Sequence, residues 1–327
     1  HLGGDRQHRR IPRRDPDDYR LCHGGGGHAE QKCGGEEEAH GVSLSRMRGG
    51  CLIGSAAGII LLDSAYKRTN VLAGFFSFNR QGFRRVASAP AVARYLRRQF
   101  PGKPLNWRAT PWVAVYPGIG IALNRLQKNA NSSAVVLLQD LETGVVEHQR
   151  EAKNRIRTLF DFGLSHRRIP KDLAHVVIVR NPYSRVLSAF LNKSSSTKIR
   201  RRHGTFEATR EGFGDFLRFL EEGGLSSDSH WDLQTRHMVL PPGAYDGIVR
   251  FENLREEMLA FLARQGLEPR PGSLEEIYPS ARGKATDATA KLDAFYTPES
   301  RDRVARLFAP DFEALGYDTA YPGVLAE

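Results

Sequence analysis

Cysteine is scarce in this chain of 327 residues: Cys22, Cys33 and Cys51 are its only three, and all lie within the first 51 residues. A fold held together by disulfides is therefore excluded, as is a cysteine nucleophile beyond residue 51. The chain also lacks an apolar run of about 18 residues, the length that a conventional membrane-spanning helix requires. Apolar residues nevertheless make up 40% of the chain and charged residues 26%, which excludes a wholly disordered protein.

Acidic residues are almost missing from residues 51–110, which contain ten lysines and arginines against one aspartate. The flanking parts are nearly balanced, with nine basic against eight acidic residues in 1–50 and 29 against 28 in 111–327. The net charge of +11 therefore comes almost entirely from one segment. A basic face on the main domain, the usual sign of nucleic-acid binding, is not indicated, and we expect no nucleic-acid partner.

The first 110 residues are predicted to lie outside the main domain. Residues 1–50 contain 11 of the 32 glycines and 5 of the 11 histidines and show no helical or strand periodicity. We interpret them as a disordered low-complexity segment. Their histidines and cysteines match none of the usual zinc-ligand spacings, and no metal site is predicted. Residues 51–110 form a basic extension, and its Arg-rich part, 66–110, is interpreted as a linker or a loosely docked segment.

A short apolar run, Cys51–Leu62, follows Arg46 and Arg48 and leaves three interpretations open. It could be the core of a signal peptide that starts at Met47, a truncated signal anchor, or a buried helix, because its twelve residues span only about 18 Å as a helix. If residues 47–65 act as a signal or anchor, we expect membrane anchoring and a Golgi or other membrane-associated location. Otherwise we expect a cytoplasmic protein.

From residue 111 onward, strand-like and helical patterns alternate. The expected strands are Val113–Tyr116, Ile119–Leu123, His175–Val179 and Gly247–Phe251. The expected helices are Ser133–Leu141, one that begins at Pro182 after the cap Asn181, Phe213–Glu222, Leu254–Gln265, and Pro298–Phe308 after the cap Thr297. This alternation predicts a three-layer α/β domain over residues 111–320, with a mainly parallel central sheet flanked by helices.

Two junctions between a strand and a helix contain residues suited to phosphate. In the first, Gln127–Ser133 (QKNANSS), a strand leads into a small polar loop and then a helix. Unpaired N–H groups at the amino end of a helix favour phosphate, and Lys128 and the hydroxyls of Ser132 and Ser133 add charge and donors. The loop does not follow the Walker pattern, and helix capping alone could explain its polar residues.

The second junction is Arg180–Lys193 (RNPYSRVLSAFLNK), in which a strand ends and a helix begins. Asn181, Ser184 and Ser188 share one face of this helix by their spacing. Arg180 and Ser188 could therefore hold one phosphate between them. The alternative is ordinary packing with a solvated polar face.

The two junctions resemble the motifs of sulfotransferases that use 3′-phosphoadenosine 5′-phosphosulfate (PAPS). The closer likeness is to the Golgi carbohydrate sulfotransferases of the chondroitin 4-O type and their bacterial relatives. Three further stretches agree in order with that family: Ser229–Gln234 (SHWDLQ), Tyr245–Glu252 (YDGIVRFE) and Phe308–Tyr317 (FAPDFEALGY). The resemblance covers about residues 112–318. It implies a P-loop-like sulfotransferase fold and transfer of a sulfuryl group from PAPS to an acceptor hydroxyl, first of all on a carbohydrate.

The resemblance also implies which residues bind the donor. The residues that correspond to the 5′-phosphosulfate loop are Lys128, Asn129, Ala130, Asn131, Ser132 and Ser133. Arg180 and Ser188 correspond to the residues that bind the 3′-phosphate. Lys128 would also stabilise the charge that develops on the leaving oxygen, so it is predicted to be catalytic as well. No metal is required in this mechanism.

The sequence departs from the family pattern at three places. Gln127 replaces a proline, and Asn181 replaces an acidic residue or a histidine. Val239–Pro242 stands where the animal Golgi enzymes have a cysteine pair. The last difference favours a bacterial or algal type of relative over a lumenal enzyme stabilised by disulfides.

The acceptor hydroxyl needs a general base with a pKa near the operating pH. His230, in the SHW motif, is predicted to be this base, and His166, upstream of the second junction, is the alternative. His148, His175 and His237 are expected to have structural roles.

Lys198–His203 (KIRRRH) is a basic run that we expect in a polar loop after the second junction. It is either a solvated surface or a clamp for an acidic or sulfated acceptor. The predicted partner is thus a glycan or another hydroxylated small molecule, which is acidic in the second case. Two other functions stay open: a non-catalytic nucleotide-binding scaffold of the same fold, and a kinase. The missing Walker loop and the lack of an evident metal-binding carboxylate at either junction disfavour the kinase.

Overall fold

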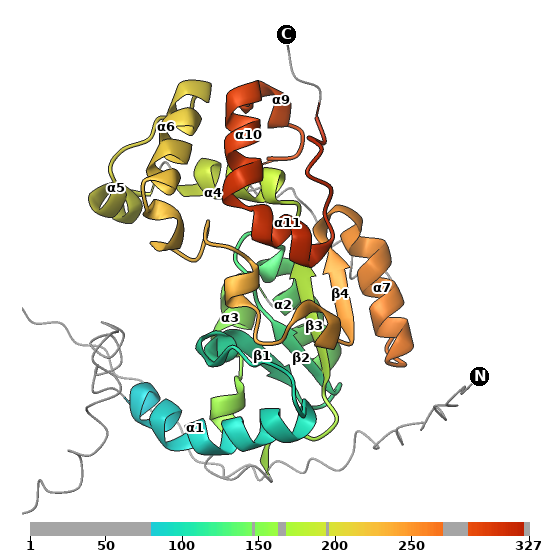
Figure 1. Ribbon diagram of the computed structural model, residues 1–327. Helices are drawn as coiled ribbons and strands as arrows, with labels where there is room; N and C mark the ends of the chain where they lie inside the picture. Colours follow the sequence, from blue (N-terminus) through green and yellow to red (C-terminus); the bar gives the residue numbers. More distant parts are fainter. Residues whose placement is uncertain (1–79, 146–147, 163–167, 194–195, 271–286, 324–327) are drawn as a thin grey trace, which may run out of the picture. The chain divides into compact units, whose positions relative to one another are not determined.

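The computed structural model of the chain describes residues 80–145, 148–162, 168–193, 196–270 and 287–323 (Figure 1). These residues belong to one compact unit, Thr69–Glu327. The predictions for residues 1–50, for the apolar run Cys51–Leu62 and for His166 lie outside the described residues.

Four strands form the sheet: β1 (Val113–Tyr116), β2 (Ile121–Asn124), β3 (Ala174–Val179) and β4 (Gly247–Arg250). The strand order is β1-β2-β3-β4. The pair β1–β2 is antiparallel, whereas β2–β3 and β3–β4 are parallel. Every residue of β1, β2 and β3 is buried, as expected for a sheet that helices cover on both faces. The predicted α/β fold with a mainly parallel sheet is confirmed.

The α-helices of the described residues are α1 (Arg80–Gln99), α2 (Asn131–Thr143), α3 (Gln149–Asn154), α4 (Pro182–Lys193), α5 (Thr197–His203), α6 (Arg210–Glu221), α7 (Leu254–Arg264), α9 (Leu292–Phe295), α10 (Pro298–Leu307) and α11 (Ala309–Leu315). On one face of the sheet, α2 and α7 pack against strand side chains such as Leu123 and Val176. On the other face, α1 packs against Val113 and Val115, and Leu315 of α11 packs near Val179. The three predicted layers are therefore present.

A cluster of aromatic side chains joins the helices beyond the carboxyl end of β3. Tyr183 and Phe190 of α4 pack with Phe213 of α6, and Trp231 and Phe312 belong to the same cluster. Figure 1 shows α4, α6, α10 and α11 gathered at this end of the sheet. Because α4 continues directly from β3, the cluster fixes the helix that carries the second junction, and it also fixes the segment around Trp231.

Helix α1 differs from the sequence interpretation of residues 66–110 as a linker or a loosely docked segment. Val92, Tyr95 and Leu96 of α1 are buried in one cluster with Val113 and Val115 of the sheet. The Ser88 hydroxyl also donates a hydrogen bond to the Phe160 carbonyl (3.1 Å). The reason for the difference is the helical spacing of the apolar residues, which puts them on one face and leaves the arginines on the other.

Smaller differences concern the ends of elements. Helix α2 begins two residues earlier than expected, at Asn131, and β2 begins two residues later, at Ile121. Residues 197–203, expected in a polar loop, form the short helix α5. The predicted cap of α10 is present as a capping box between Thr297 and Ser300. In the described part of the chain, no helix combines the length and the apolar character that a membrane span requires.

Candidate functional site

The loop between β2 and α2 has an unusual backbone. Lys128 and Ala130 both have left-handed φ angles, of 68° and 51°, a conformation that costs free energy for a residue other than glycine. Ala130 is also the N-cap of α2 and makes no side-chain capping bond. The first N–H groups of α2 have no acceptor within the helix, so they face the loop at the positive end of the helix dipole.

A buried glutamine connects this loop to the end of β3. The Gln234 Oε1 atom accepts hydrogen bonds from Asn129 Nδ2 (2.6 Å) and from the Arg180 backbone N–H (2.9 Å), and Gln234 Nε2 donates to the Arg180 carbonyl (2.8 Å). Asn129 Nδ2 also donates to the Ile178 carbonyl (2.8 Å). The two junctions that the sequence analysis singled out are thus held together by one side chain.

Arg180 lies where β3 ends, and its guanidinium is held on several sides. Its Nε donates to Ser184 Oγ (2.9 Å), and its Nη1 donates to the Lys128 carbonyl (3.2 Å). The guanidinium carbon lies 3.9 Å from the centre of the Phe251 ring. Burial lowers the pKa of Arg180 to about 10, with Glu252 opposing the shift, so the side chain stays charged at neutral pH.

The predicted partner of Arg180, Ser188, lies one turn beyond Ser184 on α4. Both serines are buried, with exposed fractions of 3% and 2%, so this polar face of α4 is not solvated. Asn181 caps α4 as predicted, because its Oδ1 accepts from the Tyr183 N–H (3.0 Å). Two of the three residues on this face are therefore shielded from solvent, so the face is not solvated as that alternative expected; ordinary packing at the second junction stays open.

Arg185, on the same helix, binds a third segment of the chain, residues 229–232, next to the two junctions. It is 1% exposed, and its guanidinium donates to the carbonyls of Asp232 (2.8 Å), Gln127 (3.3 Å) and Ser229 (3.4 Å). Lys128 follows Gln127 in the chain, and His230 follows Ser229. The two residues predicted to be catalytic, Lys128 and His230, therefore each lie next to a carbonyl that Arg185 binds.

The loop carries a concentration of positive charge. Burial and the charges of Arg180, Lys193 and Arg185 lower the pKa of Lys128 to about 7. Among the described residues, the Lys128 ammonium has neither a hydrogen-bond partner nor a carboxylate partner. The cluster thus suits a ligand with several negative charges, such as a nucleotide with phosphate at two positions.

The remaining loop residues lie at the start of α2. Asn131 is its first residue, and its buried Oδ1 has no partner. Ser132 Oγ accepts from Lys153 Nζ (2.5 Å), and Ser133 follows it in the first turn. Ala130 and Asn131 precede these hydroxyls, so four of the six predicted loop residues lie at the start of α2, directly after Lys128 and Asn129.

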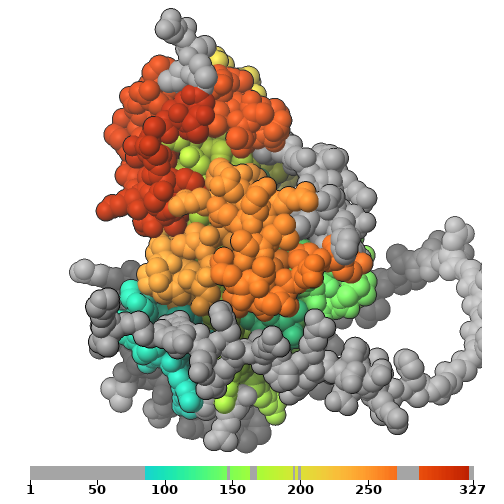
Figure 2. Space-filling view, turned by 90° about the vertical axis from the view of Figure 1, so that its right-hand side faces the viewer, coloured from blue at the N-terminus to red at the C-terminus, as the bar shows by residue number. Residues whose placement is uncertain are grey.

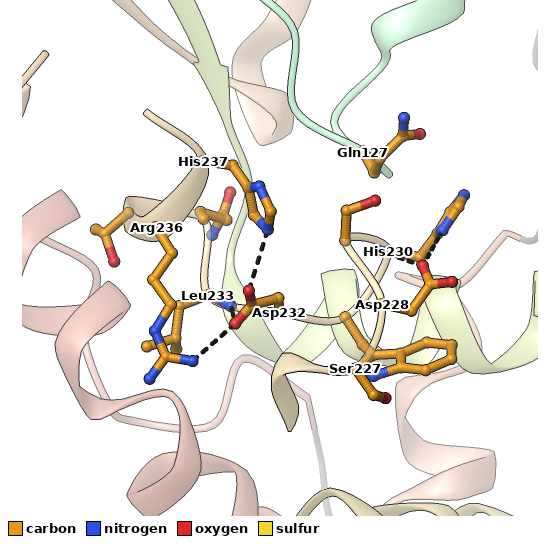
Figure 3. Close-up of polar contacts among 12 residues, drawn as sticks. Gln127, Ser227, Asp228, His230, Asp232, Leu233, Arg236 and His237 are labelled. Carbon is orange, nitrogen blue, oxygen red and sulfur yellow. Dashed lines mark hydrogen bonds and ion pairs between the residues drawn. The ribbon is translucent and has the colours of Figure 1, made fainter. Parts of the chain in front are cut away.

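His230 is oriented by an aspartate two residues earlier (Figure 3). Its Nδ1 lies 2.5 Å from Asp228 Oδ1, and its backbone N–H donates to the same oxygen (3.0 Å). Burial raises the pKa of Asp228, but the hydrogen bonds from His230 outweigh it and lower that pKa to about 2. An ionised Asp228 accepts a hydrogen bond from the Nδ1–H group, which leaves the Nε2 lone pair available as a base.

The other histidines have structural surroundings. His237 Nε2 lies 3.2 Å from Asp232 Oδ2, as Figure 3 shows, and His148 Nδ1 accepts from the Arg150 N–H (3.4 Å) at the start of α3. His175 belongs to β3, and its ring lies edge-on to Phe100 with the centroids 4.9 Å apart. Neither His175 nitrogen has a hydrogen-bond partner, and burial lowers its pKa to about 4.

His175 should therefore make the fold sensitive to acid. Its pKa is lower in the folded protein than in the unfolded chain, where it is about 6.5, so the unfolded state binds the proton more tightly. The free energy of unfolding therefore has its full value above about pH 6.5. It falls as the pH is lowered toward 4, by about 3 kcal/mol in total. Urea unfolding between pH 4 and 7 should show a smaller loss for His175→Leu than for the wild type. His148→Asn, which removes an exposed histidine and keeps a helix cap, should follow the wild type; parallel curves for all three proteins would contradict this assignment.

Several positioning residues were not singled out by the sequence analysis. Gln234 and Arg185 lie within the motifs that resemble the family's, but their positions in the sequence do not indicate a role. Asp311 of α11 is fully buried and accepts from the backbone N–H groups of Gln234 (2.7 Å) and Thr235 (3.0 Å). Asp228 lies just before the SHW motif. The available signal for Gln234, Arg185 and Asp311 was the order of the motifs, since each of these three connects one motif to another. The Asp228 carboxylate instead binds His230, within its own stretch of sequence.

Val239–Pro242, which stands where the resemblance implies a cysteine pair in the animal Golgi enzymes, is anchored without cysteines. Val239 and Leu240 are buried in the cluster that contains α1. The Val239 N–H donates to Asn124 Oδ1 (2.7 Å), and the Tyr245 hydroxyl donates to the same oxygen (2.7 Å). This segment therefore has its own polar and apolar anchors.

In the described part of the chain, no group of three or more His, Cys, Asp or Glu side chains is arranged to hold a metal ion. A mainly parallel α/β sheet with a cationic loop and a buried arginine at the strand ends is suited to phosphate-bearing or sulfate-bearing ligands. Residues 113–318, more than half of the chain, match the profile of the Sulfotransferase family. The chain therefore belongs to the sulfotransferase family and is a transferase. A search of curated proteins and of solved structures found no match.

Proposed function

We propose that this sulfotransferase takes its sulfuryl group from PAPS and transfers it to a hydroxyl group of a carbohydrate. The observation that carries the proposal is the link between the two junctions. Gln234 binds both Asn129 and Arg180, and Arg180 Nη1 binds the Lys128 carbonyl. A donor with phosphate at both its 5′ and 3′ positions needs two anion sites at a fixed separation, and this network supplies a rigid connection between them.

Different residues bind the donor, stabilise the leaving group and accept the proton in the proposed reaction. The 5′-phosphosulfate would lie against Lys128–Ser133, and the 3′-phosphate against Arg180 and Ser188. The bound donor supplies the sulfuryl group: its bond to the 5′-phosphate oxygen breaks as the bond to the acceptor oxygen forms, and 3′-phosphoadenosine 5′-phosphate is the leaving group. Lys128 places a positive charge where the leaving oxygen becomes negative. His230 Nε2 accepts the proton of the acceptor hydroxyl while Asp228 holds the opposite side of the ring.

An acidic acceptor would find a complementary surface on α5. Arg200, Arg201 and Arg202 are exposed and have no ion-pair partner among the described residues. The His203 ring, which ends this helix, lies 5.4 Å from the Trp231 ring, and Trp231 follows His230. The last residue of the helix that carries these arginines therefore packs against the segment that carries the proposed base. Exposed arginines on this helix favour a carboxylated or sulfated glycan over a neutral alcohol.

A transfer assay with radiolabelled PAPS tests the proposed function. The purified chain is incubated with a panel of neutral, carboxylated and sulfated glycans and with simple alcohols. We expect label on the acidic glycans, and less of it at high salt, because exposed ion pairs are screened. Tight nucleotide binding without transfer to any acceptor would favour a scaffold, and transfer of phosphate from ATP would favour a kinase.

The lowered pKa of Lys128 predicts that nucleotide binding depends on pH. With a pKa of about 7 in the free protein, Lys128 loses its proton above pH 7, whereas a bound phosphate favours the protonated form. Binding of 3′-phosphoadenosine 5′-phosphate should therefore take up a proton, and its Kd should rise about tenfold per pH unit between pH 7.5 and 9. Lys128→Arg, whose side chain stays charged, should show a flat profile. A flat profile in the wild type would contradict the role of Lys128.

A further inference from the structure

The outer surface of α1 presents positive charges that the proposed reaction does not use. Arg94, Arg97 and Arg98 are exposed, and so are Lys103 and Arg108 in the stretch that follows the helix. Among the described residues, none of the five has a carboxylate partner. The opposite side of α1 is buried against the sheet, so this helix is rigidly mounted and its arginines face outward.

Exposed apolar side chains lie among these arginines. Val86 is 64% exposed and Trp107 is 40% exposed, and they are two of the three large apolar residues that are exposed in the described part of the chain. The Arg97 guanidinium lies 5.5 Å from the centre of the Trp107 ring. At about 100° per residue, Val86, Arg94 and Arg97 fall in one sector of the helix.

The combination of exposed arginines with exposed apolar side chains suits some anionic partners better than others. A nucleic acid or a polysulfate would use the arginines but would gain little from an exposed valine. A lipid surface uses both, because phosphate headgroups attract the arginines while tryptophan and aliphatic side chains enter the interface. The composition therefore favours a membrane surface with anionic headgroups.

The location of α1 fits such a contact. Leu173, which precedes β3, packs in the same cluster as α1, so α1 lies toward the amino end of β3. The proposed donor site lies at the carboxyl end, where Arg180 follows the strand. Figure 1 shows α1 at one end of the sheet and α4 and α11 at the other, and Figure 2 shows α1 (cyan) at the lower edge, away from the C-terminal helices (red).

We propose that the α1 surface, defined by Val86, Arg94, Arg97, Arg98 and Trp107, docks the protein on an anionic lipid surface. The donor site then faces away from the lipid and stays open to its ligands. This contact depends on charge, so it differs from insertion of an apolar segment such as Cys51–Leu62 and is separate from it in the chain.

Vesicle co-sedimentation of the full chain tests the proposal. Vesicles of phosphatidylcholine alone are compared with vesicles that also contain phosphatidylserine. We expect binding to the anionic vesicles to exceed binding to the neutral ones and to weaken with salt. The combined change Arg94→Glu, Arg97→Glu and Arg98→Glu should weaken anionic binding at least tenfold. The matched control, Arg200→Glu, Arg201→Glu and Arg202→Glu on α5, has the same charge change and should bind the anionic vesicles like the wild type.

Trp107 provides a second readout. Its fluorescence should shift to shorter wavelength on anionic vesicles, and Trp107→Phe should lack that shift. Equal binding to neutral and anionic vesicles, equal losses in the α1 and α5 variants, or α1-dependent binding to DNA or heparin without vesicle binding would each overturn the proposal. Sulfate transfer to a soluble acceptor should be unchanged in the α1 variant, so the test is independent of the proposed reaction.

Discussion

Replacing His230 with alanine is expected to lower kcat by a factor of about 10²–10⁴, the usual contribution of a general base. The His230 ring is held by Asp228 through Nδ1, so Nε2 remains free to take the proton of the acceptor. Nucleotide affinity should change less than about twofold, because the proposed donor contacts come from Lys128–Ser133, Arg180 and Ser188. Steady-state rates with saturating donor, together with nucleotide titration, separate the two effects.

The chain offers a matched control for this change. His237 also pairs with an aspartate, Asp232, within the same stretch of sequence, and His237→Ala should keep kcat close to that of the wild type. The kcat of Asp228→Asn should lie between those of the two alanine variants, since the amide oxygen still accepts a hydrogen bond from Nδ1 but carries no charge. If His237→Ala lost the activity and His230→Ala kept it, the assignment of the base would be wrong.

Replacing Gln234 with leucine is expected to destabilise the protein and to weaken donor binding together. The change leaves the Arg180 N–H and carbonyl without their partner and removes one of the two acceptors of Asn129 Nδ2. Each buried group without a partner costs about 1–3 kcal/mol, so we expect the two groups of Arg180 to lower the free energy of unfolding by about 2–6 kcal/mol. The loop and Arg180 would no longer be held at a fixed separation. The KM for the donor should therefore rise at least tenfold.

A purely structural role for Gln234 would give a different pattern. It would lower the amount of folded protein without changing the ratio of the KM values for donor and acceptor. The control is Gln149→Leu, at an exposed position in α3, which should change neither stability nor KM beyond experimental error. Equal increases in both KM values in the Gln234 variant would argue against a role in positioning the donor site.

The parts of the fold that could be predicted from sequence are those with local signals. The apolar run before Arg180 and the cap Asn181 with Pro182 define a buried strand and the following helix within 20 residues, and the structure has both. Helix α1 was missed because Pro90 and the many arginines obscured the spacing of Val92, Tyr95 and Leu96. The buried side of that helix becomes evident only when this spacing is compared with a helical period.

The sequence predicts which residues belong to the proposed site, but not the hydrogen bonds that join them. Lys128 and Arg180 each follow a strand, so their chemistry could be inferred from their neighbours in the chain. The bonds from Gln234 to Asn129 and from Arg185 to Asp232 join residues that lie 105 and 47 positions apart. Nothing in a local pattern indicates such pairs, because they depend on how the helices beyond the sheet pack against it.

Titration of the full chain with 3′-phosphoadenosine 5′-phosphate and with ADP is the measurement that tests the central claim most directly. The first ligand has the 3′-phosphate that Arg180 and Ser188 are proposed to bind, and ADP lacks it. We predict that the 3′-phosphorylated nucleotide binds at least tenfold more tightly, because charge-assisted hydrogen bonds to a phosphate contribute about 1.5–3 kcal/mol. Equal affinity for the two nucleotides, or tighter binding of ADP, would contradict the account.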